Sequence, residues 1–157
     1  MKIGIIGTGN VAKALATAFT REGYSVMIGS RDIGNANALA GEMERFAQGG
    51  TIASAIHYGE MVVLAIPYKA VGDVLGSSDN YAGKIIVDCT NPLTRHDGYA
   101  AVAIGHTTSA AEQIAAMVPQ ARVVKAFNTA FAELMEVGPY FGPVDGSMFY
   151  CGDDAEA

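Results

Sequence analysis

The sequence predicts an α/β fold of the Rossmann type, in which helices cover both faces of a doubly wound, mainly parallel sheet. Short apolar patterns typical of strands alternate with helical patterns along the whole chain. Residues 61–66 (MVVLAI) are continuously apolar, as expected of a strand that is buried on both faces. Residues 1–12 (MKIGIIGTGNVA) join an apolar strand to an amphipathic helix through a glycine turn, which is typical of dinucleotide-binding folds.

The glycine turn is the first indication of function. Gly7 permits the tight turn, and Gly9 has no Cβ, so a ligand can approach the backbone closely. The free N–H groups near Asn10 and Val11, at the start of the helix, favour a pyrophosphate together with the helix dipole. Glycine turns also occur in proteins without nucleotides, but the position of this one between a clear strand and a clear helix favours a dinucleotide.

The other elements follow from periodicity and from the residues that interrupt it. Val11 begins an apolar helical face that Gly23 ends. Further strands are expected at residues 24–29, 51–53, 61–66, 85–88, 122–127 and 147–151. Further helices are expected at residues 35–47, 54–58, 68–75, 109–118 and 130–137, with Gly49 and Gly50 breaking the first of these. Residues 94–105 show little periodicity and are expected to form a loop, and residues 152–157 resemble a helix start.

Length, composition and charge limit the classes of protein. The 157 residues are expected to form one domain, and a net charge of −6 argues against nucleic-acid and anionic-membrane partners. No apolar run approaches the roughly 18 residues that cross a bilayer, and the chain opens on a strand instead of a signal peptide. We therefore expect a cytoplasmic protein in which Cys89 and Cys151 are reduced and buried.

The residues after the second predicted strand indicate which dinucleotide is bound. In NAD-binding folds an acidic side chain at this point accepts the ribose hydroxyls. Here the strand ends in Ser30 and Arg31, whose hydroxyl and guanidinium suit a 2′-phosphate, and an acid appears only at Asp32. The sequence thus favours NADP(H). The alternative is that Arg31 is a solvated surface charge and Asp32 binds the ribose of NAD(H).

Six motifs along the chain resemble those of a known family. They are, in order, IGIIGTGNVAKALA, VMIGSRD, VVLAIP, IIVDCTNPL, RVVKAFNT and FYCGDD. Together they resemble the NADP oxidoreductases that use the deazaflavin coenzyme F420, and the cytosolic domains of membrane ferric reductases are more distant relatives. The resemblance extends over nearly the whole chain. The combination of SRD with KAFNT is specific, whereas each motif alone is not.

The resemblance implies four groups of cofactor contacts. The 2′-phosphate of NADP would be held by Thr8, Ser30 and Arg31. The pyrophosphate would lie on the loop formed by Gly7, Gly9, Asn10 and Val11. The path from the adenosine ribose to the nicotinamide would be lined by Ile66, Pro67, Asn91 and Pro92. The nicotinamide ring would lie at residues 126–130, which include Ala126, Asn128 and Thr129.

Two departures from the family pattern concern the ligands. A lysine that some deazaflavin enzymes use as an additional phosphate contact falls near Asn35, so that donor is absent here. Family members also continue for about 50 residues beyond the GDD motif, a length typical of one to three further elements. We expect that this substrate-side segment is missing from the present sequence. The apolar surface that it would otherwise cover would favour a homodimer.

The expected chemistry is direct hydride transfer, which needs a dry pocket but no protein acid or base. His57, His96 and His106 lack metal-ligand spacing, and no GxSxG motif supports a hydrolase. Lys125 is expected to be paired at the sheet edge, although a catalytic role is an alternative. Tyr68 is expected either near the cofactor or in the core, and Asp88 is expected to cap the turn after its strand.

The favoured function is an NADP(H)-dependent oxidoreductase that transfers a hydride between the nicotinamide and a deazaflavin or similar small acceptor. A second interpretation is a reductase of imines, ketones, quinones or, through a flavin, ferric iron. A third is a non-catalytic NADP(H)-binding module that senses redox state. A methyltransferase is a more distant alternative, because it also has a glycine turn after its first strand.

Overall fold

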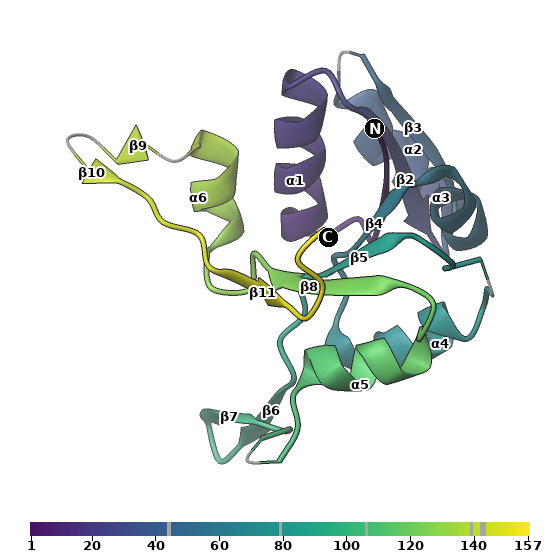
Figure 1. Cartoon of the computed structure of the whole chain (residues 1–157). Coiled ribbons are helices and arrows are strands. Elements are labelled where there is room, and N and C mark those ends of the chain that lie inside the picture. Colours follow the sequence, from purple (N-terminus) through teal and green to yellow (C-terminus); the bar gives the residue numbers. More distant parts are fainter. Residues whose placement is uncertain (44, 79, 106, 139, 142–143) are drawn as a thin grey trace.

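The central feature of the fold is one seven-stranded sheet (Figure 1). A computed structural model describes residues 1–43, 45–78, 80–105, 107–138, 140–141 and 144–157. The strand order is β11-β8-β5-β4-β1-β2-β3, and every neighbouring pair is parallel except β8 and β11. The strands are β1 (Lys2–Ile6), β2 (Ser25–Ser30), β3 (Ala47–Thr51), β4 (Met61–Leu64), β5 (Ile85–Asp88), β8 (Arg122–Ala126) and β11 (Tyr150–Gly152).

Helices cover both faces of this sheet, which confirms the predicted doubly wound Rossmann-type fold. The first face carries α1 (Asn10–Arg21), α2 (Ile33–Gly41) and α6 (Ala132–Val137). The second face carries α3 (Ile52–Tyr58), the short 3₁₀ helix η1 (Tyr68–Ala70), α4 (Val71–Leu75) and α5 (Ala110–Met117). The chain builds β1, β2 and β3 outward and then returns to β4, so the direction of winding reverses between β1 and β4.

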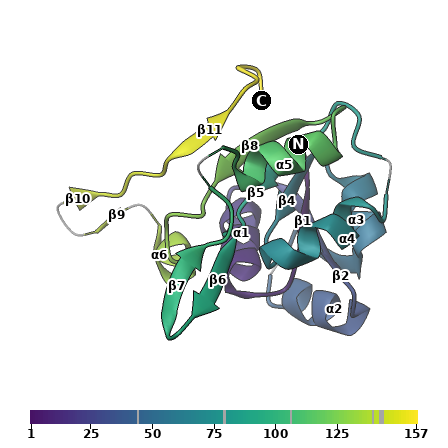
Figure 2. The ribbon, with the colours of Figure 1, turned by 90° about the horizontal axis from the view of Figure 1, so that it is seen from below.

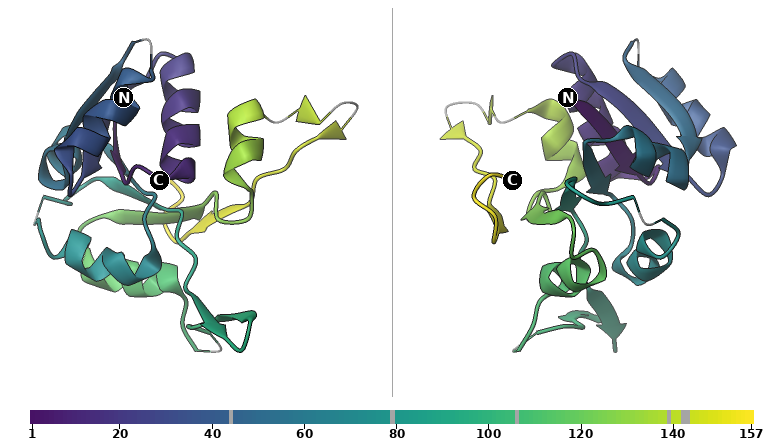
Figure 3. Two further views of the ribbon diagram at one scale, coloured as in Figure 1. Left: turned by 180° about the vertical axis from the view of Figure 1, so that it is seen from behind. Right: turned by 45° about the vertical axis from the view of Figure 1, so that its right-hand side comes forward.

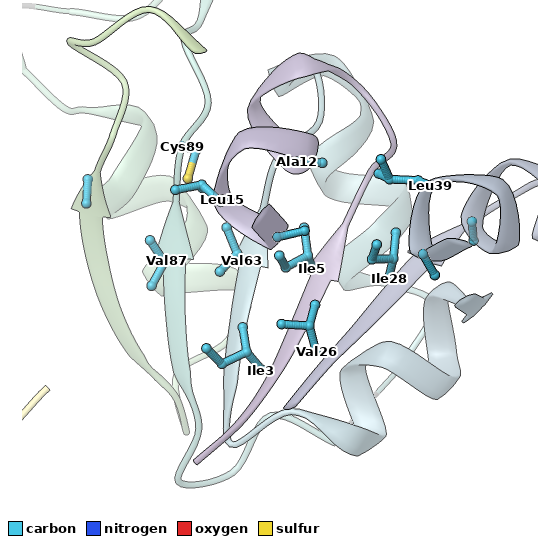
Figure 4. Close-up of a cluster of buried hydrophobic side chains, with 14 residues drawn as sticks. Ile3, Ile5, Ala12, Leu15, Val26, Ile28, Leu39, Val63, Val87 and Cys89 are labelled. Carbon is cyan, nitrogen blue, oxygen red and sulfur yellow. The ribbon is translucent and has the colours of Figure 1, made fainter. Parts of the chain in front are cut away.

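A buried apolar cluster joins the first helical face to the sheet (Figure 4). Ile3 and Ile5 of β1, with their neighbours on β2 and β4, point toward α1 and are fully buried. Ala12 of α1 is also fully buried, which agrees with the expectation that this small residue lets the helix pack on the strand. This packing fixes the start of α1 against the end of β1, where the glycine turn lies.

The predicted helix break at Gly49 and Gly50 is wrong. These glycines lie inside β3, which pairs with β2, and α2 already ends at Gly41. A Cβ on Gly49 would lie 2.4 Å from the backbone nitrogen of Asn37 in α2. A Cβ on Gly50 would lie 2.6 Å from Ser54 Oγ in α3. The glycines therefore allow two helices to approach the strand, and the strand expected at residues 51–53 is instead the end of β3 and the start of α3.

The loop predicted at residues 94–105 contains an antiparallel hairpin (Figures 2 and 3). Its strands are β6 (Leu93–His96) and β7 (Tyr99–Val102), and it projects away from the sheet. The turn residues Asp97 and Gly98 have positive φ values of 47° and 84°. An Asp-Gly pair is a recognised hairpin signal. The strands lack a clear apolar alternation because β7 is exposed along its whole length, and this exposure explains why periodicity did not predict them.

The last part of the chain extends to one side of the sheet (Figures 1 and 3). It comprises α6, a small hairpin of β9 (Tyr140–Phe141) with β10 (Val144–Asp145), and the return to β11. The predicted helix at residues 130–137 and strand at 147–151 are correct in type but begin two to three residues too early. Residues 153–157 form a turn in which Asp154 Oδ1 accepts a hydrogen bond from the Glu156 N–H.

Across the described residues, no helix has the length and apolar character needed to span a membrane.

Candidate cofactor site

An open cleft of about 780 Å³ lies at the carboxyl ends of β1, β2 and β4. Seven of the predicted cofactor residues line it: Gly7, Thr8, Gly9, Ser30, Arg31, Ile66 and Pro67. This position adjoins the point where the winding of the sheet reverses, and doubly wound sheets bind their ligands at such a point. The fold thus brings together residues from three separate strand ends at the place where a dinucleotide is expected.

The glycine turn forms the floor of the cleft. Gly7 has a φ of 118°, and its N–H donates to the Gly29 carbonyl at 2.9 Å, which ties the ends of β1 and β2 together. A Cβ on Gly7 would lie 2.3 Å from the Ala65 carbonyl oxygen, whereas one on Gly9 would meet nothing within 4 Å. Backbone at Gly9 is therefore open to the cleft, and no side chain among the described residues caps α1 there. This cradle fits a pyrophosphate, which needs free N–H donors and little side-chain bulk.

Two of the predicted pyrophosphate residues do not present side chains to the cleft. Asn10 is exposed at the start of α1, and Val11 packs against the core on the first face of the sheet. Neither residue lines the cleft. Any contact of Asn10 or Val11 with a phosphate must therefore come from the backbone N–H groups in the first turn of α1.

Three polar side chains at the end of β2 differ in their hydrogen-bond partners. Asp32 Oδ1 accepts a hydrogen bond from the Gly34 N–H at 2.8 Å and so caps α2. Ser30 Oγ accepts one from the Asp32 N–H at 3.2 Å. Arg31 lines the cleft, and its guanidinium has no ion pair with any residue that the structure describes. Because the carboxylate is committed to a helix cap and the guanidinium is not, this end of the cleft suits an anion.

Lys69 is a cleft residue that the sequence analysis did not identify. It lies in η1 and lines the same cleft as Arg31, with Asp73 and Ser77 of the following segment. Ile52, Ala70 and Val74 add apolar surface. The feature of the sequence that could have indicated Lys69 is its positive charge two residues after Pro67, the residue that ends a buried strand. No local pattern indicates toward which side of a short 3₁₀ helix such a side chain points.

The remaining predicted residues lie outside this cleft, at the ends of β5 and β8. Asn91 Nδ2 donates to the Asn128 carbonyl oxygen at 3.1 Å, and Asn128 Nδ2 donates back to Asn91 Oδ1 at 3.4 Å. Phe127, which lies between β8 and Asn128, has a φ of 65°, an uncommon backbone conformation for a non-glycine residue. The chain brings Asn91 and Asn128 together, whereas Ala126 is a buried core residue and Pro92 and Thr129 are not part of the 780 Å³ cleft.

A buried ion pair lies directly before these loops. Lys125 Nζ donates to Asp88 Oδ2 at 2.9 Å, and Asp88 is fully buried. The predicted pairing of Lys125 is therefore correct, but its predicted place at the sheet edge is wrong, because β11 covers β8 on that side. Asp88 Oδ1 accepts from the Thr90 N–H at 2.8 Å, which confirms the predicted cap of the turn.

Side chains around the ion pair remain protonated over a wide pH range. Burial, followed by the nearby Asp88 carboxylate, raises the pKa of the Cys89 thiol to about 12. Burial and then Asp88 also raise the pKa of Tyr68, whose hydroxyl donates to Gln113 Oε1 at 2.7 Å. Tyr68 is partly buried, packs against the core of the second face and does not line the cleft, so the structure shows the predicted packing at the core or its rim and not the predicted place near the cofactor.

None of the histidines in the described part of the chain lines the cleft. His57 is exposed in α3 with Nδ1 3.0 Å from Asn80 Nδ2, His96 lies on β6, and His106 lies outside the described residues. The part of the chain that the structure describes contains no cluster of three or more potential metal-ligating side chains. Cys89 is buried as predicted, but Cys151 is exposed, because β11 is an edge strand that no further element covers.

Fold and site together define a Rossmann-type protein with an open cleft at the point where the winding of the sheet reverses, where such folds bind their ligands. The chain belongs to the family described as NADP oxidoreductase, coenzyme F420-dependent, whose pattern matches residues 2–92. This membership confirms the resemblance predicted from the motifs, the oxidoreductase class and NADP as the cofactor of that class.

Known relatives extend the comparison over the whole chain. The F420-dependent NADP reductase of Methanothermobacter marburgensis is 32% identical and is matched over 100% of this chain and 75% of its own length. Metalloreductase STEAP3 of Rattus norvegicus is 34% identical over 99% of this chain, which spans only 30% of that protein.

Solved structures agree with the fold. The crystal structure of an Arthrobacter sp. FB24 protein is 34% identical with a TM-score of 0.87, covering 99% of this chain and 75% of its own. A reductive aminase from Aspergillus terreus, in complex with NADPH and ethyl levulinate, is 25% identical with a TM-score of 0.64 and is matched over 84% of this chain and 42% of its own.

Proposed function

We propose that residues 1–157 form a single NADP-binding domain, and that the protein transfers a hydride between the nicotinamide of NADP(H) and a deazaflavin or similar small acceptor. The observation that carries the cofactor half of this proposal is the guanidinium of Arg31, which lines the cleft without an ion pair to any described residue, beside a carboxylate that caps α2. The acceptor half rests on the F420-dependent NADP reductases, of which this chain matches 75% and 72% of the length in two Methanothermobacter species.

Different residues of the cleft would bind the pyrophosphate and the 2′-phosphate of the cofactor. The backbone at Gly7 and Gly9, with the start of α1, would hold the pyrophosphate, and Thr8, Ser30 and Arg31 would hold the 2′-phosphate. The nicotinamide, once bound, supplies or receives the hydride at its own ring. The protein must then orient that ring and exclude water, and it needs no acid or base for the transfer itself.

The site proposal is tested by the substitution Arg31→Ala. We expect the affinity for NADPH to fall about 5–150-fold, the equivalent of about 1–3 kcal/mol for a charge-assisted hydrogen bond, while the affinity for NADH is unchanged. Calorimetric titration of both dinucleotides measures this. Arg21→Ala is the matched control, because Arg21 lies in the last turn of α1 and does not line the cleft. Equal losses for NADPH and NADH would show that Arg31 does not contact the 2′-phosphate.

The acceptor is tested by NADPH oxidation with a panel of deazaflavin, flavin with ferric iron, imine and quinone acceptors. Turnover with the deazaflavin supports the proposal, and its absence contradicts it. The second candidate is metal reduction through a flavin, which the 34% identity to a metalloreductase over 99% of this chain favours. A protein that binds NADPH tightly but reduces none of these acceptors would instead be a redox-sensing module.

Association into a homodimer is also proposed. Several large apolar side chains are exposed around α6 and β11, namely Phe131, Val137, Phe149 and Tyr150. Contiguous exposed apolar surface commonly marks an interface between proteins. Sedimentation equilibrium should therefore give twice the monomer mass at micromolar concentration, and Phe149→Ser combined with Tyr150→Ser should weaken the association. A monomer at all concentrations would contradict this expectation.

A further inference from the structure

The buried ion pair holds the backbone of one residue, Thr90, on both sides of its Cα. Lys125 Nζ donates to Asp88 Oδ2 at 2.9 Å and also to the Thr90 carbonyl oxygen. Asp88 Oδ1 accepts from the Thr90 N–H at 2.8 Å. One ammonium and one carboxylate thus fix both backbone polar groups of Thr90. Asp88 is fully buried, and the side chain of Lys125 is 16% exposed.

The network lies directly before the two loops at the ends of β5 and β8. Asn91 follows Thr90, and Phe127 and Asn128 follow Lys125 by two and three residues. The two asparagine side chains bridge the loops through the hydrogen bonds between Asn91 and Asn128. Phe127 adopts its positive φ between these two attachments. The ion-pair network before the loops and the hydrogen bonds between Asn91 and Asn128 therefore fix the conformation of both loops.

Stability alone does not account for this arrangement. Burying two charges is costly, and buried ion pairs can often be replaced by apolar residues without loss of stability. The Thr90 hydroxyl is also buried, without a hydrogen-bond partner among the described residues. Polar groups retained at such a cost serve best where a precise backbone geometry is required, and functional sites depend on supporting contacts of this kind.

The loops lie at the carboxyl ends of β5 and β8, in the second half of the sheet. The cleft described above lies at the carboxyl ends of β1, β2 and β4 and is also lined by η1 and α4, and none of its lining residues comes from these loops. A dinucleotide on a doubly wound sheet places one nucleotide over each half. The nicotinamide end therefore belongs over β4, β5 and β8, where Asn91 and Asn128 lie.

We propose that Lys125 is a positioning residue for the nicotinamide half of the cofactor: through Asp88 and the Thr90 backbone it fixes the loops that receive the ring. This proposal rests on the proposed NADP(H)-binding function. Lys125 does not contact the ring itself. Its role is to join the carboxyl ends of two parallel strands, so that the residues following each strand keep one relative position.

The test separates the two halves of the cofactor. Titration with 2′,5′-ADP measures the affinity for the adenosine half alone, and the emission of bound NADPH reports on the dihydronicotinamide. The variant is Lys125→Met combined with Asp88→Asn, which leaves no unpaired buried charge and retains an acceptor for the Thr90 N–H. We expect its affinity for 2′,5′-ADP to stay within about twofold of wild type, and the emission of bound NADPH to shift from the wild-type position toward that of free NADPH.

A conservative variant and a matched control complete the test. Lys125→Arg keeps a charged donor and should restore the wild-type emission, which a loss of general packing would not predict. If the double variant does not fold, Lys125→Gln combined with Asp88→Asn replaces it, because this pair also leaves no unpaired buried charge, and the same shift is expected. Lys84→Met is the control, because Lys84 Nζ also donates to a carbonyl oxygen, that of Gly59 at 2.6 Å, before the start of β5 and at the opposite end of the sheet.

The outcomes distinguish the inference from the function on which it rests. Wild-type emission in the double variant, or an equal shift in Lys84→Met, would overturn the role of Lys125. Failure of the wild-type protein to bind both 2′,5′-ADP and NADPH would overturn the proposed function instead. Binding of both ligands by the wild-type protein, with an emission shift in the double variant but not in Lys125→Arg or Lys84→Met, supports the positioning role.

Discussion

Asp32 illustrates how the local partner of one side chain decides the character of a whole site. Its carboxylate accepts the Gly34 N–H at the start of α2, and this contact leaves the neighbouring Arg31 as the charged side chain at the end of β2 that lines the cleft. Had Asp32 faced the cleft, the same two residues would have favoured the ribose hydroxyls of NAD(H).

The capping role of Asp32 predicts the effect of removing its carboxylate. Asp32→Ala should lower the free energy of unfolding by about 0.5–2 kcal/mol, the usual cost of losing an N-cap, without changing the ratio of NADPH to NADH affinity. Asp32→Asn retains a capping oxygen and should restore most of the stability. Denaturant unfolding and dinucleotide titration measure the two effects. A changed affinity ratio in Asp32→Ala would place the carboxylate in the cofactor site.

Sequence reasoning at the residue scale succeeded where the chemistry is local and failed where it depends on distant partners. Ser30 and Arg31 line the cleft as expected, because their position follows directly from the end of one strand. Lys69 and the partner of Lys125 were not identified, because which groups meet is decided by strand order, and Asp88 is 37 residues away in the sequence. The exposure of Cys151 likewise depends on β11 being an edge strand.

At the scale of elements, glycine has two opposite meanings that the sequence alone did not separate. Gly23 ends α1 with a φ of 81°, as periodicity predicted. Gly49 and Gly50 instead lie within β3, where the absence of a side chain admits α2 and α3. The packing of the structure shows which role applies, because β3 has no apolar run from which a strand could be predicted.

The close packing at Gly49 predicts a strong effect of one methyl group. Gly49→Ala should lower the free energy of unfolding by about 1–3 kcal/mol, because its Cβ would lie 2.4 Å from a backbone nitrogen of α2. Gly41→Ala is the matched control: it lies in α2 with open space around its Cβ, and alanine should raise stability by about 0.5–1 kcal/mol. Urea unfolding measures both. Similar stabilities for the two variants would show that α2 can move away from β3.

At the scale of the whole molecule, the buried titratable groups predict how stability depends on pH. Burial raises the pKa of Cys89 and of Tyr81 to about 12, from ordinary values of 9.0 and 10.0. Above pH 9 the unfolded chain therefore releases protons that the native protein retains. The stability that these groups provide is fully present below pH 9 and is lost as the pH rises toward about 12.

Denaturant unfolding over a series of alkaline pH values tests this dependence. The free energy of unfolding should fall steadily above pH about 9, and Cys89→Ala should give a shallower fall. The overall stability of that variant will be lower because it creates a cavity, so the slope with pH is the relevant quantity. A slope identical to wild type would mean that the Cys89 thiol ionises freely in the native state.

The cleft and the loops of the ion-pair network come from separate parts of the sequence. All its lining residues fall within positions 6–77, whereas the loops of the ion-pair network follow β5 and β8 and lie between positions 88 and 129. In the proposed function, selection of the dinucleotide and presentation of its reactive ring thus belong to consecutive stretches of the sequence and do not alternate along it. A single crossover between α4 and β5 would exchange one without the other. Chimeras joined there should keep the NADPH preference of the parent that supplies the first stretch.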